Sequence, residues 1–171
     1  MINSYDILRH SDHRGSFFEV PNRTEAEIAQ YSVSISNKGV LRGLHYQYQP
    51  PMGKQINIIK GSILDCVVDL RLSSPTYGKH KLILCTPEKN SSIYVPPGFA
   101  HGFLSLEDDT TILYLQTSLY NKKGEGGICP FDDHLKIDWG ITREECVLSE
   151  KDSEAESFLE FTAKNFNWSI L

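Results

Sequence analysis

Apolar and polar residues alternate in short runs along most of the chain, which is the pattern of β-strands that bury one face. The clearest runs cover residues 55–60, 62–70, 81–84, 92–95, 103–106 and 110–117. Glycine and proline separate them, as Gly61 and Pro75 do, and both residue types favour turns. The spacing predicts a mainly β protein, an antiparallel barrel or sandwich. Because the chain shows no internal repeat and no linker, we expect one domain over residues 1–171.

Two motifs of the form S/T-x-x-E predict helices, because such residues can cap a helix start reciprocally. Residues 24–27 (TEAE) should open a short helix that ends near Gln30. Residues 153–156 (SEAE) should open a longer one. Beyond the second motif, side chains of one helical face recur at Phe158, Leu159, Thr162 and Phe166. We expect that face to pack on the barrel.

Two of the predicted strands carry polar side chains on one face. In the 62–70 run, Asp65 and Asp69 lie opposite a fully apolar face. Carboxylates on a half-buried face need water, polar partners or a catalytic task, and the pattern leaves open whether that face is solvated or lines a cavity. In the 110–117 run, Tyr114 and Gln116 point the same way. A strand tyrosine taken alone is typical of packing.

Composition narrows the class of function. The formal net charge is −5 and the chain has no long basic run, so nucleic-acid binding is not expected. A few arginines could still hold a small anionic ligand. No apolar window reaches the ~18 residues of a membrane span, and the N-terminus lacks the pattern of a signal peptide. The four cysteines show no C-x-x-C spacing, so we expect no membrane association and a cytoplasmic protein with free thiols.

Two histidine motifs carry most of the chemical information: VLRGLHYQ at residues 40–47 and PPGFAHGF at residues 96–103. They resemble the two halves of a cupin site. The usual cupin metal set includes a His-x-His pair, and here the first motif has His45-Tyr46-Gln47. His45 and His101 are only two ligands, with Asp65 as a third candidate, whereas a metal site needs about three in a defined geometry. A metal-dependent cupin enzyme therefore stays an alternative.

Proton-transfer chemistry fits these residues better. The sequence contains no nucleophile elbow, no GxGxxG and no Walker motif. Histidine changes its charge near neutral pH, so His45 is a candidate general base. An aspartate on its other ring nitrogen would fix the tautomer, a tyrosine on the opposite wall could return a proton, and a lysine would stabilise an enolate. Such a set suits epimerisation next to a ketone.

Further motifs follow in order between residues 12 and 152: DHRGSFFE at 12–19, GVLRGLHYQ at 39–47, VDLRLSSPTYG at 68–78, PGFAHGF at 97–103, IDW at 137–139 and LSEKD at 148–152. Together they resemble the dTDP-4-dehydrorhamnose 3,5-epimerase family of nucleotide-sugar enzymes. The resemblance implies a cupin-type antiparallel β-barrel (jelly roll) with a few short helices. It also implies a homodimer that acts on a nucleotide-diphosphate sugar without a metal or other cofactor.

The resemblance also implies roles for individual residues. The catalytic set would be His45 as base, Asp152 as its carboxylate partner, Tyr114 as acid on the far face, Lys54 near the C4 oxygen, and Asp65. A second set would bind the nucleotide, its diphosphate and the sugar, with some members reaching across a dimer. That set comprises Arg14, Phe17, Glu19, Gln30, Ser32, Arg42, His101, Tyr120 and Glu125.

The chain departs from the family pattern at four positions. Ser32 replaces a usual asparagine, Asn57 a frequent arginine, Leu119 an aromatic residue and Pro130 a tryptophan. Nearly all of these positions are expected to touch the nucleotide or sugar, so the chemistry is retained and the substrate stays open. It could be a dTDP-linked 4-keto-6-deoxyhexose or a GDP-linked 4-keto hexose or heptose. A 3-only epimerase, a keto-isomerase and a non-catalytic sugar-binding cupin are further alternatives.

Overall fold

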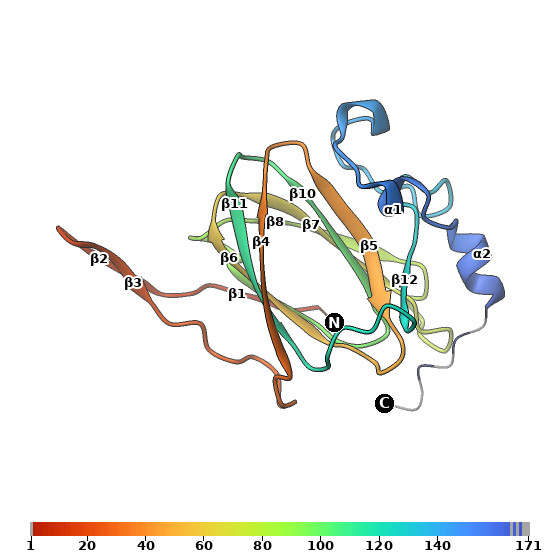
Figure 1. Cartoon of the computed structure of the whole chain (residues 1–171), viewed down its shortest axis with the longest axis horizontal. Helices are drawn as coiled ribbons and strands as arrows, with labels where there is room; N and C mark the ends of the chain where they lie inside the picture. Colours follow the sequence, from red (N-terminus) through yellow and green to blue (C-terminus); the bar gives the residue numbers. More distant parts are fainter. Residues whose placement is uncertain (1, 165, 167, 169–171) are drawn as a thin grey trace.

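Two five-stranded antiparallel sheets face each other in the computed structural model, which describes residues 2–164, 166 and 168 (Figure 1). The first sheet has the order β1 (Ser4–Tyr5), β9 (Ser92–Val95), β6 (Lys54–Lys60), β11 (Thr110–Gln116) and β4 (Gln30–Ser36). The second has the order β12 (Glu125–Gly127), β5 (Leu41–Gln47), β10 (Phe99–Ser105), β7 (Ile63–Asp69) and β8 (His80–Cys85). The predicted mainly β, cupin-type antiparallel fold is confirmed. The single domain predicted for 1–171 also includes residues outside this description and stays a prediction.

Apolar side chains from both sheets fill the space between them and form one core. Its fully buried members include Ile56, Ile58, Ile63, Ile93 and Ile112. Burying one such side chain stabilises the fold by about 1.5–3 kcal/mol. A second core covers the outer face of the second sheet, where β5, β7 and β10 pack against the C-terminal segments. Strand β7 is thus buried on both faces, which places Asp65 between the sheets rather than in solvent.

Strands β5 and β10 approach closely at two glycines. A Cβ on Gly43 would lie 2.5 Å from the Cα of Gly102, and a Cβ on Gly102 would lie 2.8 Å from the carbonyl oxygen of Arg42. Gly43 also has φ +121°, a conformation that side chains other than glycine rarely adopt. The close approach brings the two histidine motifs together, because His45 and His101 are direct partners in the β5–β10 ladder.

The helix predicted after residue 24 is absent, so that prediction was wrong. Residues 24–26 form bends, and the Thr24 hydroxyl accepts a hydrogen bond from the amide of Ala26 at 3.0 Å. The flanking backbone bonds to the first sheet: the amide of Arg23 donates to Gln55 and the amide of Ala29 to the carbonyl of Gln116. The amide of Ala29 is therefore not available to a helix, and a local turn at Thr24 competes successfully.

The C-terminal helix exists, but it begins four residues later than predicted. Helix α1 (Glu150–Ser153) ends at the residue expected to open it, and α2 (Phe158–Ala163) starts after a capping box formed by Ser157 and Glu160. Phe158 is buried as predicted, whereas Leu159 is 55% exposed and Phe161 takes its place in the core. A short 3₁₀ helix, η1 (Arg143–Glu145), precedes α1. No helix in the described part of the chain is both long and apolar enough to cross a bilayer.

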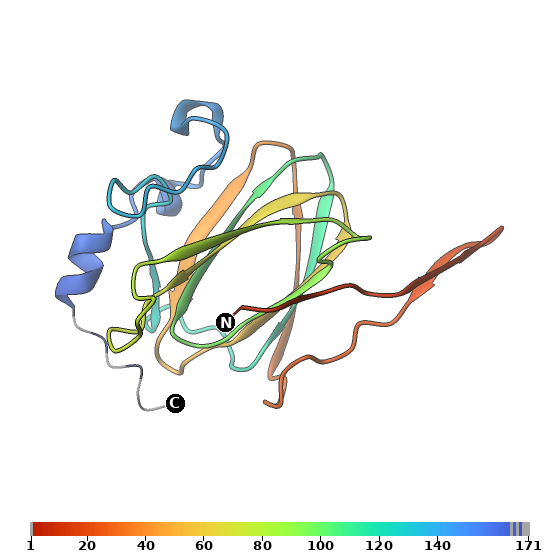
Figure 2. The ribbon, with the colours of Figure 1, turned by 180° about the vertical axis from the view of Figure 1, so that it is seen from behind.

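A two-stranded hairpin projects away from both sheets (Figures 1 and 2). It consists of β2 (Arg9–Asp12) and β3 (Gly15–Phe18), and we call it the arm. Arg9 fixes its base: the guanidinium donates to the carbonyls of Ile58 and Ile59 at 3.1 Å and lies 3.7 Å from the ring centre of Phe18. The arm is thus held to the edge of the molecule at its base, while its outer part is exposed.

Candidate active site

A cavity of about 300 Å³ lies between the two sheets, next to α1. Its walls come from β5 and β10 of the second sheet, from β4, β6 and β11 of the first sheet, and from α1 with its capping residue. The lining residues are Ser32, Arg42, His45, Lys54, His101, Phe103, Tyr114, Gln116, Ser149, Lys151 and Asp152. Seven of them belong to the predicted site: Ser32, Arg42, His45, Lys54, His101, Tyr114 and Asp152.

His45 and Asp152 form a close pair on one wall. The Nε2 of His45 lies 2.5 Å from Oδ1 of Asp152, and the carboxylate is almost fully buried. Burial acts to raise the pKa of Asp152, but hydrogen bonds from His45 and Ser149 outweigh it and lower that pKa. An ionised carboxylate can only accept, so Nε2 carries the proton and the lone pair of the neutral ring lies on Nδ1. Asp152 therefore fixes the tautomer that a general base needs.

The sequence around α1 explains how Asp152 reaches His45. The amide of Leu41, at the start of β5, donates to the carbonyl of Val147 at 3.1 Å, which ties the segment before α1 to that strand. Ser149 then caps α1 by accepting from the amide of Asp152 at 3.1 Å. The short capped turn presents the Asp152 side chain to the cavity.

Tyr114 faces the same cavity from the first sheet, opposite the sheet that carries His45. Its phenol shares a 3.0 Å hydrogen bond with the hydroxyl of Ser34 on β4, in which either oxygen can donate. Burial raises the pKa of Tyr114 to about 12, although the bond to Ser34 opposes the shift. The phenol is thus protonated at neutral pH and can donate a proton. A base and an acid therefore stand on opposing sheets of one cavity.

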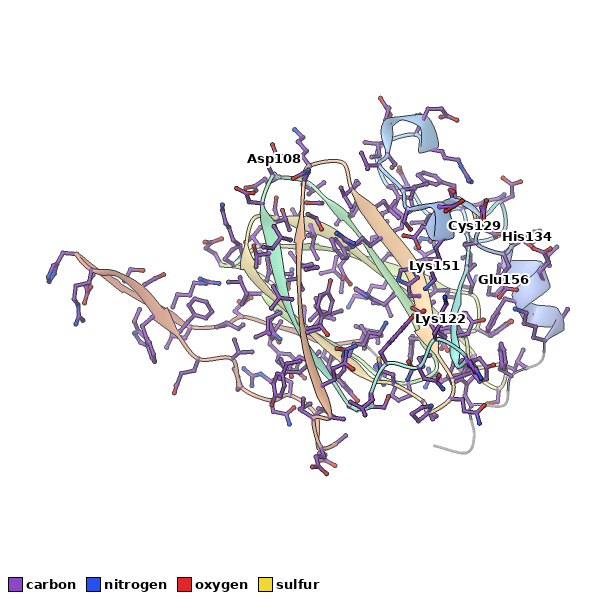
Figure 3. All side chains as sticks on the ribbon, viewed as in Figure 1. Asp108, Lys122, Cys129, His134, Lys151 and Glu156 are labelled. Atoms are coloured by element: carbon purple, nitrogen blue, oxygen red, sulfur yellow. The ribbon has the colours of Figure 1, made fainter. Side chains whose placement is uncertain are left out.

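Cationic groups dominate the charge of the cavity lining. Arg42, Lys54 and Lys151 line it, against one carboxylate, Asp152. Burial lowers the pKa of Lys54 to about 8, an effect that Glu125 opposes and Lys151 strengthens. Lys151 lies beside β5 (Figure 3), and its ammonium is 2.6 Å from Oε2 of Glu125. Although the chain has a net charge of −5, the cavity suits an anion.

A second histidine–aspartate pair lies beneath the cavity. The Nε2 of His101 is 2.6 Å from Oδ2 of Asp65, and both side chains are buried. Within the described part of the chain, the other carboxylate oxygen of Asp65 has no hydrogen-bond partner. His101 lines the cavity and Asp65 stands behind it, so Asp65 acts on the cavity through His101.

Three more predicted binding residues lie around the cavity without lining it. The side-chain Nε2 of Gln30 donates to the hydroxyl of Ser32 at 3.1 Å, and its Oε1 accepts from the backbone amide of Tyr120 at 2.9 Å. The hydroxyl of Tyr120 donates to Glu125 at 2.9 Å. These successive hydrogen bonds connect Glu125, the ion-pair partner of Lys151, to Ser32, which lines the cavity.

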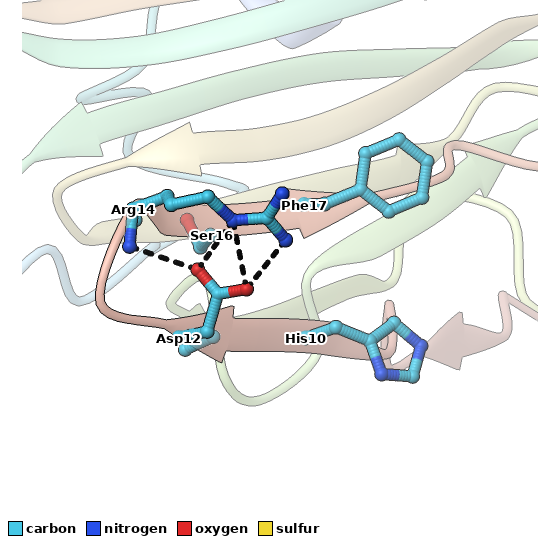
Figure 4. Close-up of a pocket in the computed structure, with 7 residues that line it drawn as sticks. His10, Asp12, Arg14, Ser16 and Phe17 are labelled. Atoms are coloured by element: carbon cyan, nitrogen blue, oxygen red, sulfur yellow. Dashed lines mark hydrogen bonds and ion pairs between the residues drawn. The ribbon is translucent and has the colours of Figure 1, made fainter.

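Arg14, Phe17 and Glu19 are not near the cavity within this chain. Arg14 and Phe17 belong to a separate hollow on the arm, where Arg14 makes a bidentate ion pair with Asp12, the shortest contact being 2.6 Å (Figure 4). The pair lowers the pKa of Asp12 and raises that of Arg14. Phe17 is 67% exposed, and Glu19 lines another hollow at the base of the arm. Sequence reasoning alone cannot place these residues relative to the cavity, because the arm's direction is a tertiary property.

Of the four departures from the family pattern, Ser32 is the one that lines the cavity. Asn57 lies on the outer face of the first sheet, where its Oδ1 accepts from Gln55 and Ser92. The carbonyl of Pro130 accepts from the indole of Trp139 at 2.8 Å, within the outer core. Asn57, Leu119 and Pro130 are not among the residues that line this cavity, and strand alternation turns Asn57 away from it. That nearly all four positions touch the ligand stays a prediction.

Phe103, Gln116, Ser149 and Lys151 line the cavity although sequence reasoning did not assign them to it. The sequence contained features that could have identified three of these residues. Gln116 shares its strand face with Tyr114, and Ser149 and Lys151 belong to the LSEKD motif that contains Asp152. In the part of the chain that the structure describes, no group of three or more His, Cys, Asp or Glu residues is arranged to hold a metal ion.

Comparison with known proteins shows the family of the chain. The family model described as dTDP-4-dehydrorhamnose 3,5-epimerase matches residues 4–160. The chain belongs to this epimerase family. The dTDP-4-dehydrorhamnose 3,5-epimerase of Mycobacterium tuberculosis is 40% identical over 159 residues, 87% of this chain and 79% of that protein. The predicted class, an isomerase acting on carbohydrate derivatives, is confirmed.

Two further relatives in the epimerase family bear on the substrate. The dTDP-4-dehydro-6-deoxyglucose 3-epimerase of Streptomyces bikiniensis is 37% identical over 161 residues, 89% of this chain and 82% of that protein. A solved structure of the Legionella pneumophila 3,5-epimerase, in complex with dTDP-4-keto-L-rhamnose, is similar with a TM-score of 0.86. Its sequence is 31% identical, and the match covers 98% of both chains. Both relatives are named for dTDP-linked sugars.

Proposed function

We propose that the protein epimerises a dTDP-linked 4-keto-6-deoxy sugar at C3, or at C3 and C5. The observation that carries this proposal is the pairing of His45, on the second sheet, with Asp152 of α1, and the position of Tyr114 on the first sheet, around one cavity. Family membership supports the substrate class. Epimerisation needs a proton removed from one face of the sugar ring and a proton returned to the opposite face, and opposing sheets provide both groups.

The reaction begins when the Nδ1 lone pair of His45 takes the proton from the carbon next to the ketone. Asp152 stabilises the imidazolium that forms. The electrons of the broken C–H bond move to the C4 oxygen, where the ammonium of Lys54 stabilises the enolate. Tyr114 then donates a proton to the opposite face of the carbon, and the ketone is restored. The ketone acts as the electron sink, so these steps use neither a metal nor a redox cofactor.

The remaining lining residues suit the nucleotide diphosphate. Arg42 offers a planar guanidinium for bidentate phosphate binding, and Ser36 steadies it by accepting from its Nε at 3.1 Å. Lys151 adds a second cation to the cavity lining, where its ion pair with Glu125 holds the ammonium. The contacts among Gln30, Ser32 and Tyr120 leave polar and aromatic groups beside the cavity for the base.

A homodimer would complete the site with residues from the arm. Arg14, Phe17 and Glu19 lie away from the cavity in this chain, and Arg9 anchors the arm at its base. Strand β4 exposes an apolar row, Tyr31, Val33 and Ile35, each more than 60% exposed. Such a row is typical of a surface that a second copy covers. In the dimer we expect the arm of one protomer to reach the cavity of its partner.

Deuterium exchange tests the proposal. The protein is incubated in D₂O with dTDP-4-keto-6-deoxyglucose and with its GDP-linked counterpart, and NMR follows exchange and inversion at C3 and C5. Exchange at both carbons indicates a 3,5-epimerase, exchange at C3 alone a 3-epimerase, and faster turnover of the GDP sugar the alternative nucleotide. Metal analysis and chelation in the same assay test the metal-dependent alternative.

Two variants test the roles of the base and the acid. His45→Asn should reduce exchange by about 10²–10⁴-fold, the usual contribution of a general base. Tyr114→Phe should reduce inversion more than exchange, since the phenol acts after proton removal. His134→Asn is the matched control, because His134 is exposed and lies near α2 (Figure 3). Full exchange in His45→Asn would remove His45 as the base.

A further inference from the structure

Strand β4 places a serine at every second position on the face toward the cavity. Each hydroxyl bonds to one cavity-lining side chain: Ser32 to Gln116, Ser34 to Tyr114 and Ser36 to Arg42. The alternate residues of the strand point outward and are apolar. The row is therefore not a solvated strand face. It fixes one wall of the cavity, and each serine has a separate lining partner.

The proposed reaction leaves Tyr114 in the wrong protonation state after each inversion. Once the phenol has given its proton to carbon, the oxygen is a phenolate while His45 holds the proton from the other face. The next turnover requires a proton on Tyr114 and none on His45. Two groups on opposing sheets cannot exchange that proton directly with the sugar between them, so Tyr114 needs its own path to water.

The surroundings of Tyr114 offer one such path. Among the hydrogen bonds of the described residues, its oxygen has a single partner, the hydroxyl of Ser34 at 3.0 Å. Arg42 acts on the phenol through its charge and favours the phenolate, while Asp65 disfavours it. Neither of these groups can supply a proton there, since Arg42 keeps its proton and Asp65 bonds to His101.

Ser34 is well placed between the phenol and solvent. It is half-buried on β4, which is the edge strand of the first sheet, and it lies on the face opposite the apolar row that we expect a second copy to cover, so its exposed part stays open to water. A serine hydroxyl donates one hydrogen bond and accepts others, and can therefore receive a proton while it donates its own. Ser32 and Ser36 are not equivalent, because their partners, Gln116 and Arg42, give up no proton in the proposed reaction, whereas Tyr114 does.

We propose that Ser34 is the positioning and proton-relay residue of Tyr114. As the phenol gives its proton to the sugar carbon, the hydroxyl of Ser34 donates its hydrogen to the phenolate oxygen and takes a proton from water. The hydroxide left behind is balanced when His45 releases its proton to solvent. No charge accumulates over a cycle. This inference rests on the proposed epimerase function.

The test compares Ser34→Ala, Ser34→Thr and Ser36→Ala in the D₂O assay. In Ser34→Ala, exchange at the carbon should persist while kcat for inversion falls by about 10- to 100-fold, the effect of losing a hydrogen bond to a charged group, with little change in KM. Ser34→Thr keeps the hydroxyl and suits a strand, so it should restore most of the inversion. Ser36→Ala should instead raise KM through Arg42 and leave the ratio of exchange to inversion unchanged.

The outcomes separate this inference from the proposed function. If the unmodified protein exchanges and inverts its substrate and Ser34→Ala keeps the same ratio of the two rates, Ser34 is not a relay and the epimerase function stands. A threonine variant as slow as the alanine variant would also overturn the relay, because the hydroxyl would not be the active feature. If the unmodified protein neither exchanges nor inverts any 4-keto sugar, the function fails and the relay falls with it.

Discussion

At the residue scale, the site depends on how neighbouring side chains set protonation states. Asp152 is ionised and fixes the His45 tautomer, burial keeps Tyr114 protonated, and burial lowers the pKa of Lys54 to about 8. The His45, Asp152 and Tyr114 set was predictable, because family motifs mark these positions. Ser34 was not, because it stands in a polar–apolar alternation that looks like any edge strand. The cross-strand register places Ser34 opposite Ile112, and the hydrogen bond to Tyr114 crosses the two strands diagonally, so only the three-dimensional structure identifies that partner.

The lowered pKa of Lys54 predicts an alkaline limit on activity. Lys54 stabilises the enolate only when protonated, so kcat/KM should fall as the pH rises through about 8. Lys54→Arg keeps a positive charge to a much higher pH. The alkaline fall in kcat/KM should therefore move up by more than one pH unit, even if the maximal rate is about tenfold lower. A pH–rate profile of both proteins measures this. An unmoved limb would assign the alkaline limit to another group.

At the element scale, several strands were predicted closely, whereas the bounds of the helices were not. The predicted runs 55–60, 92–95 and 110–117 match β6, β9 and β11 to within one residue, because alternation reports burial directly. The helix at 24–30 failed because its backbone donors bond to the first sheet. The C-terminal helix shifted because two capping motifs lie four residues apart, and the second one includes Phe158 in a buried turn.

The turn after β7 should contribute measurably to stability. Asp69 is buried, and its carboxylate accepts hydrogen bonds from Arg71, Ser74 and Thr76. Burial acts to raise the pKa of Asp69, but these hydrogen bonds outweigh it and lower that pKa. Asp69→Asn should lower the free energy of unfolding by about 1.5–3 kcal/mol at pH 7. The difference in the free energy of unfolding should persist at pH 4 and shrink only as the pH falls below 3.8, the ordinary pKa of an aspartate. The reason is that Asp69 stays ionised to a lower pH in the folded protein than in the unfolded chain.

Urea unfolding of both proteins between pH 7 and pH 3 measures this contribution. Asp133→Asn serves as the matched control, because Asp133 is exposed, and it should change stability by less than about 0.5 kcal/mol. Equal stability of Asp69→Asn and the unmodified protein at pH 7 would show that the turn holds without the carboxylate.

At the scale of the whole molecule, the structure divides the predicted binding residues between two places. Most surround the cavity, whereas Arg14 and Phe17 lie on the projecting arm. The sequence indicates that all belong to one function but not that they occupy separate regions of the chain. The separation of these residues depends on helix packing, on sheet register and on the contacts of Arg9 that anchor the arm. The exposed row on β4 and the arm are the two features on which the proposed association with a second copy rests.

Mixed protomers test whether the arm acts across a dimer. Arg14→Ala should raise KM about 10-fold or more through the loss of one charged contact, and His45→Asn should be inactive. When the two variants are mixed and allowed to exchange subunits, one site of each hybrid pairs an intact His45 with an intact arm, so activity should return. Sedimentation analysis checks that both variants associate. A mixture no more active than its parts would place Arg14 in its own protomer's site or outside the site.

The alternation along β4 makes the chemistry sensitive to strand register. Tyr114 pairs with Ser32 and Ile112 with Ser34, so the hydroxyls face inward only in this alignment with β11. A slip of one position would turn Tyr31, Val33 and Ile35 into the cavity and push every hydroxyl into the bulk. A register shift of one residue would thus give a molecule with the same strands but an apolar cavity. Tyr114 would then have no serine hydroxyl from which to regain its proton.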